Sequence, residues 1–108
     1  MSSRQKGYRV ERKIRLLFEA DGWRVIRSGA SLGEVDLICL KKGKCILLQV
    51  KSSKKKTYYY YEYNKKTLDG FPFYLVVDFG YGKIRILHPK KLITTNDGVD
   101  LKKFLKSH

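Results

Sequence analysis

The sequence contains few cysteines, and their positions exclude a disulfide framework. Only two of its 108 residues are cysteine, Cys39 and Cys45, and both lie inside apolar runs typical of strands. They are expected to be core thiols in a reducing cytoplasm. The two histidines, His88 and His108, add no CxxC or HxxxH spacing, so a zinc site built from these four residues is not favoured.

Long apolar runs are also missing. No stretch approaches the roughly 18 apolar residues that a membrane-spanning helix needs, and the N-terminal segment has no apolar signal-peptide core. We find no linker, no internal repeat and no low-complexity tail. A chain of this length with 43% apolar residues is therefore expected to form one cytoplasmic domain, residues 1–108.

Acidic residues are scarce. Ten Asp and Glu stand against 24 Lys and Arg, which gives a formal net charge of +14. Self-repulsion on this scale lowers stability, and a polyanionic partner explains it most simply. Nucleic acid is the favoured partner. An anionic membrane surface is the alternative, although no amphipathic basic helix dominates the sequence.

The spacing of apolar residues predicts a small α/β domain. The first helix shows an apolar stripe with the period of 3.6 residues, and Gly22 is a natural stop for it. Short runs that are apolar on both faces predict central strands covered by helices. The expected elements are a helix at 3–21, strands at 23–27, 34–40, 44–50, 73–79 and 83–87, a loop leading into a short helix at 52–66, and a last helix at about 97–106.

One pair of predicted strands carries polar side chains. In the segment ILLQVKSSKKK, Gln49 and Lys51 lie two residues apart and are expected to point to the same face. A short Lys-Lys-Gly turn predicts that this strand pairs with the preceding one, which can bring Asp36 close to Gln49. Glu11 lies at the margin of the apolar stripe of the first helix, where it can face the same strand end.

This combination of side chains is typical of phosphodiester chemistry. Carboxylate, amide and backbone carbonyl oxygens suit Mg²⁺ or Mn²⁺ rather than zinc. Such a metal polarises a phosphodiester and lowers the pKa of water, while a lysine orients that water or stabilises negative charge. The alternative interpretation is a partly buried ion pair of Asp36 and Lys51 beside Gln49. Spacing alone does not separate the two.

The set Glu11, Asp36 and Gln49-Val50-Lys51 resembles the motif of the PD-(D/E)xK nuclease superfamily. More narrowly, residues 4–56 are similar to archaeal-type Holliday junction resolvases, through YRVERKIRLLFEADGW, RVIRSGAS, G-x-x-D-L-I and a strand ending in x-x-K-S. The resemblance implies a restriction-endonuclease-like core with a central mixed five-stranded sheet flanked by helices. It also implies a homodimer that cuts opposing strands of a four-way junction symmetrically.

The resemblance also implies a role for each position. Lys51 would assist the nucleophilic water, and a serine after the first strand, Ser31 or Ser28, would shape the active site. The implied cofactor is Mg²⁺, with Mn²⁺ as a substitute. The implied metal ligands are the side chains of Asp36, Gln49 and Glu11 and the backbone of Val50.

Two positions depart from the family pattern. Gln49 stands where archaeal resolvases usually have Glu, and the loss of one negative charge should weaken metal affinity. The QxK variant nevertheless occurs in active relatives such as Mrr-like restriction nucleases. Val35 replaces the proline that names the superfamily. Two alternatives therefore stay open: an Mrr-like restriction or repair nuclease, or a non-catalytic junction-binding protein.

Basic side chains supply the expected DNA contacts. A charge run is often only a solvated face, but here the lysines follow the predicted site directly. The tyrosines Tyr58 to Tyr61 and Tyr63 are expected in core or dimer contacts, with base stacking as the alternative. The expected phosphate-binding residues are Arg4, Lys6, Arg9, Arg27, Lys54, Lys55 and Lys56.

Overall fold

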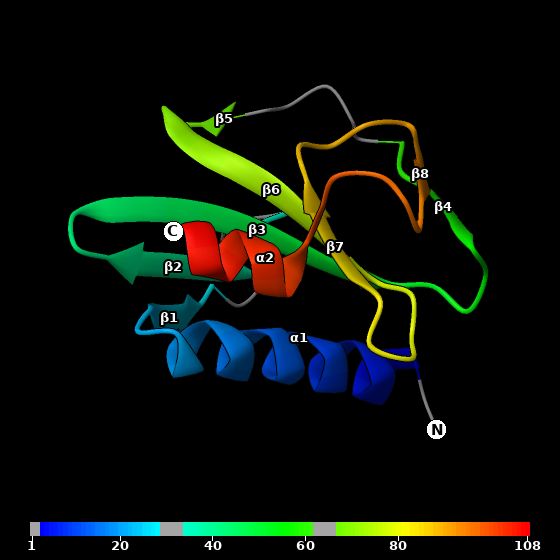
Figure 1. The fold of residues 1–108 in the computed structure, drawn as a ribbon, viewed down its shortest axis with the longest axis horizontal. Coiled ribbons are helices and arrows are strands. Elements are labelled where there is room, and N and C mark those ends of the chain that lie inside the picture. Colours follow the sequence, from blue (N-terminus) through cyan, green and yellow to red (C-terminus); the bar gives the residue numbers. More distant parts are fainter. Residues whose placement is uncertain (1–2, 29–33, 62–66) are drawn as a thin grey trace.

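The computed structural model describes residues 3–28, 34–61 and 67–108, with side chains from Gly7 onward. Two helices, α1 (Ser3–Ala20) and α2 (Leu101–Ser107), lie at the two ends of the described chain (Figure 1). The strands between them are β1 (Arg24–Arg27), β2 (Leu37–Lys41), β3 (Lys44–Ser52), β4 (Thr57–Tyr59), β5 (Thr67–Leu68), β6 (Phe71–Asp78), β7 (Ile84–Leu87), β8 (Leu92–Thr94) and β9 (Val99–Asp100).

The central sheet is mixed, as the sequence predicts. Its order is β1-β2-β3-β6-β7-β9, and β5 pairs with β6. The middle pair, β3 and β6, is parallel, whereas the other pairs are antiparallel. The sheet therefore has seven strands and not the expected five. The two additional strands, β5 and β9, contain two residues each, which is too short to produce a recognisable apolar period.

The two faces of the sheet are covered differently. Both helices contribute to one apolar cluster, in which Ile14 and Phe18 of α1 and Phe104 of α2 meet the inward residues of the strands. On the other face, Leu75 and Val77 of β6 belong to a second cluster with residues from the β4 and β8 region. The expected helical cover is therefore confirmed for one face only. Short strands help to cover the other face.

The tyrosine stretch forms a strand where the sequence analysis expected a loop leading into a helix. β4 pairs with β8 in a separate two-stranded sheet, so that expectation is wrong for residues 57–59, and residues 62–66 lie outside the described part. Tyr58 and Tyr60 pack on the second cluster, whereas Tyr59 and Tyr61 are exposed. This alternation has the period of a strand, but four identical side chains conceal it in the sequence.

The last helix begins later than predicted. Val99 and Asp100 pair with β7 as β9, and the Asp100 side chain then caps α2 by accepting a hydrogen bond from the Lys102 N–H at 3.1 Å. An aspartate in this position satisfies one of the free N–H groups of the first turn. The helix consequently spans Leu101–Ser107, and the preceding residues belong to the sheet.

The cysteines are free thiols. Cys39 is completely buried in the core, where burial raises its pKa to about 12, with a smaller contribution from nearby Cys45. Cys45 is half-buried near the start of β3. The expectation of core thiols is thus confirmed fully for Cys39 and in part for Cys45. In the described residues, no helix is long and apolar enough to cross a membrane.

Candidate active site

The start of β2 creates an open position beside β3. The antiparallel register pairs Leu37 with Leu48, and continuing it by one residue sets Asp36 opposite Gln49. The Asp36 N–H donates to the Leu48 carbonyl at 2.8 Å, which fixes the backbone at this point. The carboxylate of Asp36 then takes the place of a backbone carbonyl of a neighbouring strand. Its Oδ2 accepts a hydrogen bond from the Val50 N–H at 2.7 Å.

Val50 contributes its backbone to the site. In an extended strand, the N–H and C=O of one residue point to the same side. Since the Val50 N–H points to Asp36, the carbonyl oxygen of Val50 is directed to the same edge of β3. The side chain of Val50 belongs to the core under α1, so the strand is held firmly beneath this edge.

Glu11 of α1 reaches the same place. A pocket of about 330 Å³ has both Glu11 and Asp36 in its wall, together with Lys51 from the following part of β3. The structure thus brings these three predicted residues together. The complete lining consists of Gly7, Val10, Glu11, Asp36, Val50, Lys51 and Ser52.

Arg27 stands beside this pocket as the partner of Glu11. Its Nε lies 3.7 Å from Glu11 Oε1, and its guanidinium lies over the ring of Tyr8, 4.9 Å from the centroid. The Arg27 side chain remains 46% exposed, so it is open to solvent as well. The sequence analysis assigned Arg27 to phosphate binding and did not foresee its contact with Glu11, since that contact depends on how α1 packs on β1.

The two carboxyl groups lie in surroundings that disfavour their charged forms. Burial raises the pKa of Glu11, the nearby charge of Asp36 raises it further, and Arg27 and Lys51 lower it by smaller amounts. Burial likewise raises the pKa of Asp36, against the opposing effects of the Val50 N–H and Lys51. A cation between the two carboxylates would offset the cost of burying their charges and would reduce their mutual repulsion.

This electrostatic arrangement predicts that the site costs stability at neutral pH. Because the pKa of Asp36 is higher in the folded chain than in the unfolded chain, the folded state binds more protons between those two values, and stability falls as the pH rises through that window. Asp36→Asn removes the charge and keeps an oxygen for the Val50 N–H. We expect it to melt at a higher temperature than the parent at pH 7, with the difference vanishing near about pH 3, as followed by circular dichroism.

Asp97 provides a control of opposite sign. Hydrogen bonds from the Lys90 ammonium at 2.7 Å and the Thr94 N–H lower its pKa. Asp97→Asn should therefore lose stability at pH 7 and regain parity in acid. If both variants were less stable than the parent at pH 7, the charged Asp36 carboxylate would not lower the stability of the fold.

Gln49 is placed differently from the other predicted ligands. Its side chain is buried, with 8% exposed, and its Oε1 accepts a hydrogen bond from the hydroxyl of Tyr60, which belongs to the second apolar cluster. Gln49 is not part of the lining of the pocket that contains Glu11 and Asp36. Tyr60 was not singled out from the sequence as the partner of Gln49, although a buried amide requires a partner and a tyrosine run begins nine residues later.

The donors at the pocket suit a hard cation. In residues 3–28, 34–61 and 67–108 no group of three or more His, Cys, Asp or Glu side chains is arranged to hold a metal. The oxygens available at the open edge of β3 are the carboxylates of Glu11 and Asp36 and the carbonyl of Val50. A set of hard oxygen donors without thiolate or imidazole fits Mg²⁺ or Mn²⁺ better than zinc.

Only one of the two candidate serines can be placed. Ser31 lies outside the described residues. Ser28 follows β1, where its hydroxyl donates to the Val35 carbonyl and its N–H donates to the Asp36 carbonyl at 3.1 Å. Ser28 therefore holds the backbone on which the Asp36 side chain depends.

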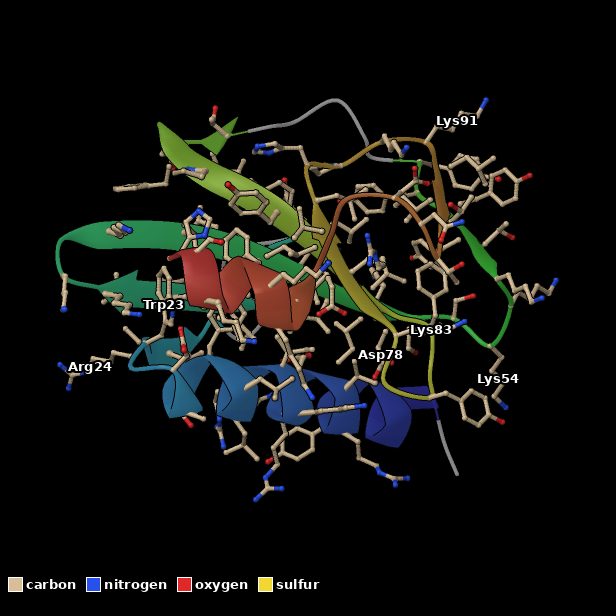
Figure 2. All side chains as sticks on the ribbon, in the orientation of Figure 1. Trp23, Arg24, Lys54, Asp78, Lys83 and Lys91 are labelled. Atoms are coloured by element: carbon tan, nitrogen blue, oxygen red, sulfur yellow. The ribbon has the colours of Figure 1, made fainter. Side chains whose placement is uncertain are left out.

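The predicted phosphate-binding residues lie on α1, at the end of β1 and in the turn after β3. Arg9 is exposed on α1, two residues before Glu11. Arg4 and Lys6 lie on the first part of α1, but their side chains are outside the description. Lys54, Lys55 and Lys56 are exposed in the turn after β3, and Figure 2 shows Lys54 at the end of the molecule remote from Trp23 and Arg24.

The chain is similar to known proteins in both sequence and structure. The family described as "Archaeal holliday junction resolvase (hjc)" matches residues 2–106. The crossover junction endodeoxyribonuclease Hjc of Methanocaldococcus jannaschii is 33% identical over 101 residues, covering 85% of this chain and 71% of that protein. Hjc of Archaeoglobus fulgidus, a Holliday junction resolvase, superposes with a TM-score of 0.71 over 94% of this chain and 96% of that one, at 17% identity. The expected restriction-endonuclease-like α/β fold is thereby confirmed.

Proposed function

This chain belongs to the archaeal Holliday junction resolvase family, and we propose that it is a Mg²⁺-dependent endonuclease that makes symmetric paired cuts in four-way DNA junctions. The observation that carries the proposal is the pocket beside β3. There, two carboxylates and an amine, Glu11, Asp36 and Lys51, lie together next to a basic turn. A charge of +14 supplies the attraction for a polyanion of this kind.

The residues of the pocket divide the chemistry among them. Asp36 is held in place by the Val50 N–H, and together with Glu11 and the Val50 carbonyl it would hold the cation. When bound, Mg²⁺ supplies Lewis-acid polarisation of the phosphodiester and a more acidic water. Lys51 orients the attacking water or stabilises the charge that develops on the phosphate oxygens. Mn²⁺ is expected to substitute for Mg²⁺.

In this proposal Gln49 lies on the face of β3 that carries the second apolar cluster, outside the wall of the pocket. Its amide oxygen is engaged by Tyr60, and an oxygen of this type keeps a second lone pair for another partner. Because Gln49 is neutral, the site has two carboxylates where relatives with Glu have three. Its affinity for Mg²⁺ should therefore be weaker than theirs, and the binding of DNA phosphates should contribute more to cation retention.

The proposed enzyme is a homodimer, because symmetric cutting of a junction requires two active sites. An exposed aromatic surface on the β4–β8 sheet supports this assembly: Tyr59 and Tyr61 stack with centroids 6.5 Å apart, and Leu92 pairs with Tyr59. Tyrosine is favoured at such interfaces. We place the protein, as a single domain spanning 1–108, in the cytoplasm of an archaeon or of a virus-infected archaeal cell.

A substrate panel tests the proposal. With Mg²⁺ or Mn²⁺, the protein is expected to cut a synthetic four-way junction at symmetric positions in two opposing strands and to leave linear duplex of the same sequence intact. Labelling each strand in turn and separating the products on denaturing gels measures this. Comparable cutting of linear, modified or mismatched duplex would indicate an Mrr-like nuclease. Binding without cutting would indicate a junction-binding protein, the alternative that Gln49 makes plausible.

A further inference from the structure

The turn between β6 and β7 presents an aromatic side chain entirely to solvent. Tyr81 has a relative exposure of 104%, the highest among the exposed large apolar side chains in the described part of the chain. The proposed hydrolysis does not use it, and neither apolar cluster includes it. An exposed tyrosine at a turn tip contributes nothing to the core, and its whole ring is open to contact with a partner outside the chain.

The backbone of this turn would be more stable with a different residue. Gly80, Tyr81 and Gly82 all have positive φ, at 87°, 52° and 77°. Left-handed backbone is costly for residues with a Cβ, and glycine or asparagine is the usual choice there. Tyrosine therefore occupies this position against the local conformational preference. Lys42 and Asp69 adopt the same conformation in two other turns, so what distinguishes Tyr81 is its exposed ring and its place in the molecule.

The turn is nevertheless held firmly. Asp78 is buried at the end of β6, and its Oδ1 accepts a hydrogen bond from the Gly80 N–H at 2.8 Å. Its Oδ2 lies 3.1 Å from the ammonium of Lys13 on α1. Two backbone hydrogen bonds between the sides of the turn, Phe79 N–H to Lys83 and Lys83 N–H to Gly80, complete the support. Tyr81 is thus carried by an ordered turn that is fastened to α1.

The position of the turn connects it with the active site. Figure 1 shows the β6–β7 turn, in yellow, reaching down beside the N-terminal half of α1, with the turn after β3 at the same end of the molecule. Tyr81 and Lys54 line one depression of about 430 Å³. That depression shares Val10 and Ser52 with the pocket of Glu11, Asp36 and Lys51.

Basic side chains lie at this end of the molecule. Lys54 lines the depression and is exposed, Lys83 is exposed just before β7, and Figure 2 shows both at this end with Asp78 nearby. A lysine-rich surface attracts the phosphate backbone of a nucleic acid, and an exposed ring among the lysines meets the bases of the same strand. Charge favours a polyanion as the partner of Tyr81, and the residues shared with the pocket of the proposed nuclease favour DNA.

We propose that Tyr81 binds DNA by stacking its ring on a nucleobase face that is exposed where the strands of the bound junction part, beside the strand that is cut. This inference rests on the proposed function and adds a residue that recognises the branch. Base pairs inside a duplex are stacked on both sides, so a ring at a turn tip finds a free base face only at a branch, a mismatch or a single strand. Tyr81 thereby favours branched over linear DNA.

Tyr81→Asn tests the stacking without weakening the turn. Asparagine tolerates positive φ better than tyrosine, so the variant is expected to melt at the same temperature as the parent or higher. Its Kd for a synthetic four-way junction should rise by about 5- to 100-fold, which is the usual effect of losing one aromatic–base stack. Tyr81→Trp should bind as tightly as the parent. Fluorescence anisotropy measures both, and 2-aminopurine beside the branch should lose its quenching in Tyr81→Asn.

A matched control removes an exposed aromatic from the other end of β6. Phe71 is 47% exposed, and Phe71→Thr, which suits a strand, should leave the Kd unchanged. If the parent cuts the junction and Tyr81→Asn binds it as the parent does, stacking is overturned and the proposed function stands. A change of oligomeric state in Tyr81→Asn, detected by light scattering, would also overturn the proposed stacking, because Tyr81 would then belong to a protein interface. A parent that neither binds nor cuts the junction contradicts the proposed function itself.

Discussion

Replacing Lys51 with alanine is expected to slow junction cutting by about 10²- to 10³-fold and to leave junction binding within about threefold of the parent. The ammonium lies in the pocket with Glu11 and Asp36, where its charge lowers the pKa of both carboxyls. Its larger effect falls on the transition state, because negative charge builds on the phosphate oxygens only as the bond breaks. Single-turnover rates at saturating protein measure this effect separately from binding.

Two further variants sharpen this experiment. Lys44 is exposed at the opposite end of the same strand, so Lys44→Ala removes an equal charge away from the pocket and should cut at the parental rate. Lys51→Arg keeps the charge but not the shape of the ammonium, and it should recover only part of the activity. Parental single-turnover rates in Lys51→Ala would support the simpler interpretation, in which Lys51 is an ion-pair partner of Asp36.

The affinity for a junction should fall by about 10³- to 10⁵-fold when the salt concentration rises from about 50 to 200 mM, as expected for a protein that neutralises roughly six to ten phosphates. The physical reason is the release of counterions by a chain of net charge +14 with exposed lysines beside its active site. Anisotropy titrations at several salt concentrations give the slope of log affinity against log salt. A flat response would contradict a binding surface built on phosphate contacts.

The same titrations locate the surface. Changing Lys54, Lys55 and Lys56 together to Gln should reduce the steepness of the slope by about 2.7, at roughly 0.9 per phosphate contact. The matched control changes three exposed lysines of α2, Lys102, Lys103 and Lys106, and lowers the net charge by the same three units, from +14 to +11. The control should keep the parental slope. Equal slopes for both triple variants would show that only the total charge matters.

The strongest sequence signals were periodic and local, and these predicted the fold well. The helix expected at 3–21 is α1, which ends one residue earlier. The strand expected at 44–50 is β3, which ends two residues later, and the strand expected at 73–79 is β6, which begins two residues earlier and ends one residue earlier. Glu11, Asp36 and Lys51 were predicted to converge because strand alternation, a tight turn and a helix stripe together fix their directions. Their chemical roles remain predictions that the kinetic experiments address.

What the sequence did not reveal depends on contacts between distant segments. The pair of Lys13 and Asp78 joins residues 65 positions apart, and no local pattern distinguishes such an aspartate from an exposed one. The hydrogen bond from Tyr60 to Gln49 likewise depends on β4 crossing the second face of the sheet. Propensity and period describe single elements, so the packing of one element on another is visible only in the structure.

The burial of Cys39 makes this chain suitable for attaching a single fluorescent reporter. With its pKa raised by burial to about 12 and no exposed surface, its thiol stays protonated at pH 7 and is shielded from maleimides. Cys45 is half-buried near the start of β3, at the end of that strand remote from Lys51. A dye would therefore join one position without mutagenesis, and its emission would report the docking of DNA and the later release of the nicked arms.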